Sequence, residues 1–296
     1  MAAIIIGLLF WLSGEDSKDQ KIADADKGKQ GTPADQRDKE GGDDNGGSSG
    51  SDDKDKETGQ PSGKSAKSLA DVPLLDRIAS NSLAVGLIDY GTILTKGGQE
   101  ILSLLPPDVP PQLSTVFKDP ATVGLDSSVP LQVVFSAYDG PGEDGLLGVA
   151  GKLEDVAKFK TVLGLLPGFE KPEEKDGYEL YVVPGSSLAC LGIAKDFFVI
   201  WSIDSGPSRM DDLVAEMEKF IHSDGSDALV NSNESFQSFA QETHDIAIWV
   251  NGRALDQVPN REEISEQLSD IFKGGSGVIS LDFENGEAVL AGELQV

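Results

Sequence analysis

The chain has 296 residues, with 51 acidic against 24 basic side chains and a formal net charge of −27. Nucleic-acid binding depends on Lys and Arg neutralising phosphates, so this balance argues against a nucleic-acid partner. It also argues against docking on anionic lipid through a basic patch. The acidity is typical of a well-solvated surface, and the alternative is a docking surface for cations or basic partners.

The chain opens with an apolar run over residues 2–12, which ends at Ser13, Gly14 and Glu15. Its length suits the core of a signal peptide better than a membrane span, which needs about 20 apolar residues. The run lacks a preceding basic segment and a following cysteine that could be acylated. We interpret residues 1–13 as a signal or anchor segment, with a core helix as the alternative.

Residues 14–67 are dominated by Asp, Glu, Lys, Gly and Ser, and they contain little that could be buried. Such a segment cannot offset its conformational entropy by apolar burial, so the sequence predicts a disordered acidic tether. Residues 59–65 look like a phosphate loop and residues 46–50 like a nucleophile elbow, but neither follows a predicted strand. An anchor with a spacer behind it indicates an exported, membrane-anchored protein of the cell envelope.

Residues 68–296 are predicted to form one α+β domain, because short apolar runs alternate with segments of helical spacing. Hairpins interrupted by single helices predict antiparallel sheet with helices on one face. The strongest hairpin signal is Asn285-Gly286. The expected strands are residues 83–89, 131–138, 146–150, 178–183, 187–194, 197–203, 246–250, 277–283 and 287–294. The expected helices are residues 90–105, 113–117, 154–166, 211–221, 233–240 and 262–272.

The order strand, helix, hairpin occurs twice, which predicts two related units at about residues 80–205 and 240–296, the second incomplete. The hairpins end alike, in AGKL at residues 150–153 and AGEL at residues 291–294. The alternative is that amphipathic hairpins resemble one another without being related. Units of a repeat tend to share one sheet. We therefore expect the strand at 287–294 to pair with the first unit, with self-association as the second possibility.

Four stretches of this domain resemble a known family: residues 83–94, 119–126, 176–178 and 236–249. They are similar to a family of bacterial exported lipoproteins of unknown function, over most of residues 82–296. The resemblance implies an envelope location and a fold of tandem α+β repeats, and it carries no catalytic residue. The chain departs from the family in lacking the lipobox cysteine and in an incomplete second unit.

The few side chains capable of chemistry all have structural interpretations. Cys190 lies in an apolar predicted strand, and no nearby histidine or basic group would lower the pKa of its thiol. This pattern favours a small buried side chain over a nucleophile. His222 and His244 lack the spacing of zinc ligands and suit surface or capping positions. The acidic group at residues 170–176 lacks the spacing of a calcium loop. Asp139, Glu143 and Asp144 favour a solvated turn, with a weak cation site as the alternative. We therefore assign no catalytic, cofactor or metal residue, and the sequence does not indicate an enzyme.

Two functions from different classes fit these observations. The first is a non-catalytic envelope domain that binds a protein, a polymer or a surface. The second is a carrier of an apolar, lipid-like ligand in a cavity between sheet and helices. A well-formed apolar pocket would favour the carrier, whereas a filled core with an exposed edge strand would favour the binding domain.

Overall fold

The computed structural model describes residues 68–69, 72–103, 120–137, 145–166, 169, 171–183, 188–203, 210–255, 275–284 and 287–295. Several predictions lie outside these residues: the segments at 1–13 and 14–67, the helices at 113–117 and 262–272, and the turn at Asn285-Gly286.

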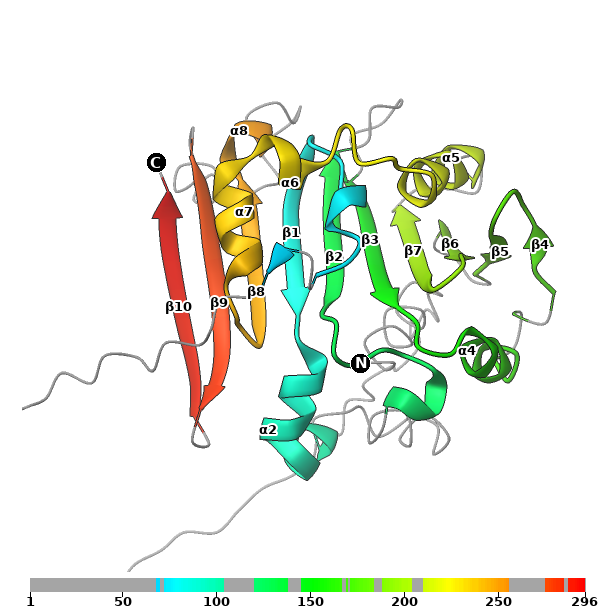
Figure 1. Ribbon diagram of the computed structural model, residues 1–296, viewed down its shortest axis with the longest axis horizontal. Coiled ribbons are helices and arrows are strands. Elements are labelled where there is room, and N and C mark those ends of the chain that lie inside the picture. The colour runs from blue at the N-terminus through cyan, green and yellow to red at the C-terminus, as the bar shows by residue number, and fades with distance from the viewer. Residues whose placement is uncertain are drawn as a thin grey trace, which may run out of the picture. The chain divides into compact units, whose positions relative to one another are not determined.

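One antiparallel sheet of ten strands organises the described chain (Figure 1). The predicted α+β class and the antiparallel pairing are confirmed, and every predicted strand is present to within two residues at each end. In spatial order the strands are β10 (Glu287–Gln295), β9 (Ser276–Glu284), β8 (Ile246–Asn251), β1 (Ser82–Ile88), β2 (Leu131–Ala137), β3 (Gly145–Lys152), β7 (Phe197–Ile203), β6 (Leu188–Ile193), β5 (Glu179–Val182) and β4 (Glu173–Glu174).

Several helices pack on one face of this sheet. α7 (Glu234–Gln241) lies in front of β8 and β9 in Figure 1. The rings of Phe236 and Trp249 meet edge to face, with 5.2 Å between their centroids. The larger core cluster fills the space between this face and its helices. The other elements on this side are η2 (Leu75–Arg77), α5 (Met210–Ile221) and α6 (Leu229–Ser232).

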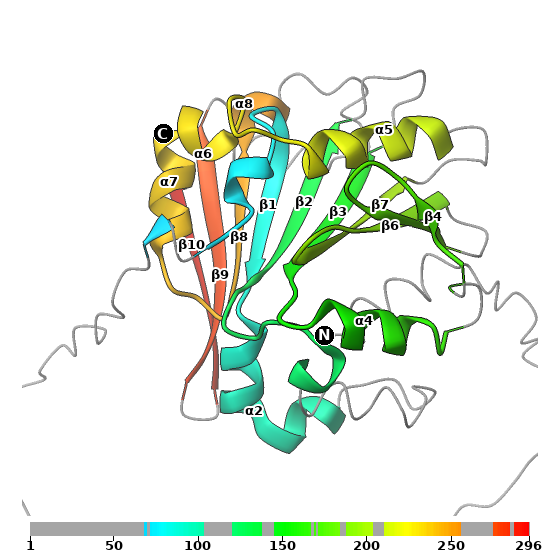
Figure 2. The same ribbon diagram turned by 45° about the vertical axis from the view of Figure 1, so that its right-hand side comes forward.

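A second core cluster lies on the opposite face, where the sequence led us to expect no helix. There α4 (Val156–Leu163) and η3 (Pro120–Val123) pack over the sheet, and Phe159 stacks on Phe198 at 5.2 Å. Figure 2 shows α4 and α5 well apart, with β6 and β7 between them. β7 is buried at all seven positions because apolar clusters lie on both of its sides.

The neighbouring strands β8 and β1, third and fourth in the sheet, lie far apart in sequence and pair antiparallel, with Gly86 opposite Ile248. The helix α2 (Tyr90–Ser103) follows β1, and the short α8 (Gly252–Leu255) follows β8. The chain from β8 onward therefore extends the sheet begun by β1, as expected. The contact with the first part of the chain is made by β8, so the preferred pairing of strand 287–294 with that part is wrong: in the described sheet β10 pairs with β9.

Two glycines share a left-handed backbone and differ in their surroundings. Gly124 and Gly177 both have φ of 79°. A Cβ at Gly124 would lie 2.0 Å from the carbonyl oxygen of Asp155, the N-cap of α4, whereas a Cβ at Gly177 would meet nothing within 4 Å. The first glycine is therefore required by close backbone packing as well as by its dihedral angle.

We predict that Gly177→Ala lowers the free energy of unfolding by about 1–2 kcal/mol, the cost of a left-handed backbone for a residue with a Cβ. Gly124→Ala adds a backbone clash at the start of α4 and should cost more than about 3 kcal/mol. Urea titration of the two variants measures both values. Equal losses would contradict the packing role of Gly124.

Candidate functional site

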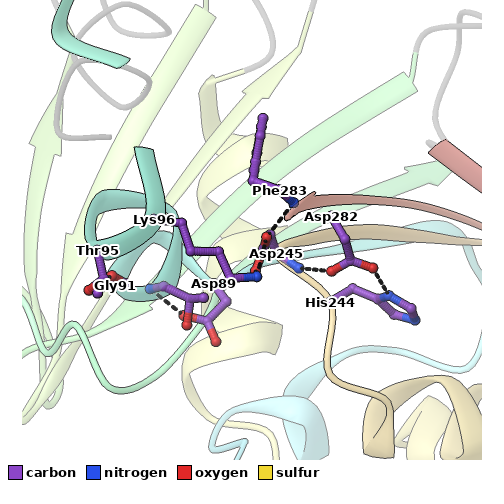
Figure 3. Close-up of polar contacts among 9 residues, drawn as sticks. Asp89, Gly91, Thr95, Lys96, His244, Asp245, Asp282 and Phe283 are labelled. Atoms are coloured by element: carbon purple, nitrogen blue, oxygen red, sulfur yellow. Dashed lines mark hydrogen bonds and ion pairs between the residues drawn. The ribbon is translucent and has the colours of Figure 1, made fainter. Parts of the chain in front are cut away.

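A buried polar network lies where β8, β9 and α2 meet, and Asp245 is its centre (Figure 3). The Asp245 side chain is 2% exposed, and both of its oxygens accept hydrogen bonds from Lys96 Nζ, at 2.8 and 2.7 Å. Its Oδ2 also accepts the backbone N–H of Phe283 at 2.7 Å. A buried carboxylate is stable only with such partners, because burial removes its hydration.

A second carboxylate joins His244 to this network. Asp282, on β9, accepts the backbone N–H of Asp245 through Oδ1 at 3.0 Å, and its Oδ2 lies 2.8 Å from His244 Nδ1. The other ring nitrogen, Nε2, lies 3.1 Å from Glu242. The sequence predicted a surface or capping position for His244. It did not reveal the pairing with Asp282, because that partner is distant in the sequence.

The start of α2 aims Lys96 at this network. The Asp89 side chain accepts the backbone N–H of Thr92 at 3.0 Å, which caps the first turn of the helix. The Asp89 backbone N–H donates to the carbonyl of Asp245 at 2.8 Å. Lys96 lies one helical turn beyond Thr92 and so on the same side of α2. Asp89, which caps α2, and Lys96 therefore both contact Asp245, the residue directly before β8.

This arrangement suits a structural clamp better than a reaction centre. Each oxygen of Asp245 already has a donor within the protein, and His244 lies between two carboxylates. The cavity beside the network, lined in part by Asp89 and His244, holds about 10 Å³, which is the room of a single water molecule. This cavity is too small for a substrate.

A larger cavity of about 520 Å³ lies between the sheet and the end of α5. Ser82, Ser136 and Trp201 contribute to its lining from the sheet, and the two serine hydroxyls lie 3.4 Å apart. The indole N–H of Trp201 is buried without a hydrogen-bond partner among the described residues. Charged side chains also line this cavity: Arg77, Glu216, Lys219, Asp224 and Asp227.

Cys190 is fully buried, as predicted, with its Sγ 3.9 Å from the sulfur of Met217. Burial raises the pKa of its thiol to about 12, so the thiolate is not formed at neutral pH. His222 is exposed just beyond α5, and its ring meets the edge of Tyr178 at 6.2 Å.

The predicted acidic groups divide between described and other residues. Glu173 and Glu174 form the edge strand β4, and Glu173 pairs with Lys175 at 2.6 Å. Residues 139–144 and 170 lie outside the described residues. Across the described ranges, no three His, Cys, Asp or Glu side chains are grouped so that they could hold a metal ion. The same part of the chain has no helix long and apolar enough to span a membrane.

Exposed apolar side chains gather over strands β8 to β10, on the face of the sheet that points away from α7. Ile248 pairs with Ile279, which lies opposite Gly292, so these residues share one face with Leu290 and Leu294. The exposed fractions are 41% for Ile248, 38% for Ile279, 72% for Leu290 and 54% for Leu294. We call these four residues the apolar strip. It ends at β10, whose outer edge pairs with no other strand of the described sheet.

These features define an α+β domain built on a single antiparallel sheet, with a structural polar clamp and an open apolar edge. The chain belongs to the family described as Domain of unknown function (DUF4836), which matches residues 102–294. The match runs from the end of α2 into β10 and so includes the apolar strip. No curated protein and no solved structure matches the chain.

The clamp at Asp245 predicts a large effect of removing its cation. Lys96→Met should lower the free energy of unfolding by roughly 2–3 kcal/mol, because it leaves a buried carboxylate without its charged donor. The control is Lys219→Met, which breaks an exposed pair with Glu216 and should cost less than about 1 kcal/mol. Urea titration compares them, and similar losses would show that Lys96 adds nothing to the clamp.

Proposed function

We propose that the chain is a non-catalytic binding protein of the cell envelope, which takes up an extended partner segment along β10. The observation that carries this proposal is the outer edge of β10, which pairs with no other strand of the described sheet. Two apolar clusters occupy the space on either side of the sheet. An exposed edge strand, beside a cavity that several charged side chains line, favours a binding domain over a carrier of an apolar ligand.

The two edges of the sheet differ in a way that supports this function. The edge at β4 has only two residues, both exposed glutamates. Short, charged edges of this kind prevent pairing with other chains. The edge at β10 has nine residues, its exposed apolar side chains include Val289 and Leu290, and it contains neither lysine nor proline. The same sheet thus protects one edge and leaves the other able to accept a strand.

The apolar strip adds side-chain contacts to this backbone edge. An added strand would gain main-chain hydrogen bonds from β10, and alternate side chains would contact Leu290 and Leu294. Backbone pairing supplies affinity for any extended segment, so discrimination between partners must come from these side chains. The partner class is therefore an extended polypeptide with apolar residues at alternate positions.

The cavity near α5 does not support the alternative, a carrier of an apolar ligand. Its lining includes Arg77, Lys219 and three acidic side chains. A lipid chain placed there would remove water from these charged groups without giving them hydrogen-bond partners, which is costly. The lining is therefore mixed, because apolar side chains such as Val134, Leu146 and Phe220 share it with the charged groups.

The envelope location rests on the sequence of the first 67 residues. An apolar run at residues 2–12 followed by an acidic, Gly- and Ser-rich spacer would hold the domain at a distance from a membrane. The spacer lets the domain search a large volume for a partner protein or polymer while it stays attached.

We predict that Leu290→Lys removes partner capture, because a lysine on an edge strand opposes the approach of a further strand. Leu165→Lys is the matched control, since Leu165 is 71% exposed against 72% for Leu290 and lies away from β10. Immobilised wild-type protein and both variants are incubated with envelope extract of the source organism. Species that bind wild-type protein and Leu165→Lys but not Leu290→Lys support the edge, and identical profiles for all three oppose it.

We predict that residues 1–13 retain the protein in the envelope. Cells that express the full chain and a version beginning at Ser68 are fractionated, and the protein in each fraction is quantified. The full chain should be found with the membranes and the shortened version in a soluble fraction. Equal recovery of both versions in the cytoplasm would reject the anchor.

A further inference from the structure

The partner that best fits the β10 edge is a second copy of the chain. We infer that two copies pair through β10, antiparallel, about a two-fold axis at Ala291, so that their sheets form one continuous sheet. This inference rests on the proposed function of β10 as a docking edge and names its occupant. Such an interface is isologous, because the same strand serves both copies.

Strand geometry limits where the axis can lie. In a regular antiparallel pair, the N–H and C=O groups of two facing residues point either toward each other or away from each other, and the two kinds of pair alternate along the strands. The two-fold axis must therefore pass through a residue and not between two residues. β10 extends from Glu287 to Gln295, and Ala291 is its midpoint. An axis at Ala291 pairs the whole strand of one copy with the whole strand of the other.

The charges on β10 favour the same axis. With the axis at Ala291, Glu287 faces Gln295 of the other copy and Glu293 faces Val289, so no glutamates are opposed. Moving the axis one residue back, to Leu290, would place Glu287 directly opposite Glu293. Like charges in facing positions are destabilising. Moving it one residue forward, to Gly292, would leave the first two residues of each strand unpaired.

The side chains of the apolar strip also fit this register. Leu290 of one copy faces Gly292 of the other, and Leu294 faces Ala288, so each large side chain lies opposite a small one. These residues share a face of the sheet, because their numbers are all even. Pairing thus joins the apolar strips of the two copies and covers part of Leu290, which is 72% exposed in one copy.

The charge of the chain sets the strength and salt dependence of this association. Each copy carries a formal net charge of −27, so two copies repel each other at low ionic strength. Salt screens that repulsion and leaves the backbone pairing and apolar contacts. We expect a dimer that forms at high protein concentration and becomes tighter as salt is added, the reverse of an interface held by opposite charges.

Cysteine cross-linking of the full chain tests both the partner and the register. Under the inferred pairing, two Ala291 residues face each other about 5 Å apart between Cα atoms, within disulfide range. Two Ala288 residues would lie six residues apart along the strands, or about 20 Å. Both positions are exposed on β10, and the native Cys190 is fully buried, so it does not compete. Ala291→Cys should give disulfide-linked dimer at least about tenfold faster than Ala288→Cys under mild oxidation.

Sedimentation of the full chain over a range of concentrations and salt supplies the second measurement. The wild-type chain and Leu165→Lys should show a salt-strengthened dimer, and Leu290→Lys should remain a monomer. A single monomer for all three proteins, or equal cross-linking at Ala288→Cys and Ala291→Cys, would overturn the inference. If the chain is a monomer while Leu290→Lys still loses its captured partners, the docking edge stands and the second copy is rejected. If capture is also unchanged, the proposed function fails with it.

Discussion

The antiparallel pairing of β1 with β8 is the interaction on which the rest of the structure depends. It joins chain segments about 160 residues apart and lies at the centre of the six strands from β10 to β3. Backbone hydrogen bonds alone do not fix its register, because a slip of two residues would keep every side chain on its face. The Asp245 carboxylate restricts that freedom, since it binds Lys96 on the helix that follows β1 and the backbone N–H of Phe283 on β9. The register of the centre then sets the position of β10 at the edge.

The sequence was a good guide to elements and a poor one to their long-range partners. Alternating and continuous apolar runs predicted the strands because side-chain periodicity is a local property. The strand β4 escaped prediction since its two glutamates carry no apolar signal, and it forms by pairing with Glu179 and Leu180. The network at Asp245 could not be found either, because Lys96 is 149 residues away along the chain. Acidic residues are so common here that no spacing marks the one that is buried.

The relation between the two halves of the domain stays a prediction, but several contacts agree with it. Asp89 and Asn251 each end a central strand, and each caps the helix that follows with its side-chain oxygen. Gly86 and Ile248 are separated along the chain by the same number of residues as Asp89 and Asn251. They also face each other across β1 and β8, as expected if a local two-fold axis between these strands relates the two halves. From Gly86 the strand pairing leads through Val133 to Val149, and from Ile248 it leads through Ile279 to Gly292. Under the two-fold relation, Gly292 therefore corresponds to Val149. The resemblance of the two hairpin ends in the sequence instead pairs Gly292 with Gly151, two residues further along β3 and on the same face.

This comparison bears on why the β10 edge is suited to binding. Under the predicted two-unit relation, the strand that corresponds to β10 is β3, and its outer side is occupied by β7 along seven residue pairs. The same architecture therefore accepts an antiparallel strand at that position. A strongly acidic surface meanwhile suppresses non-specific contacts between molecules. Only a partner that gains both a backbone ladder and apolar contacts would offset that repulsion, so the acidity of the chain would make the proposed docking edge selective where a neutral surface would make it prone to aggregation.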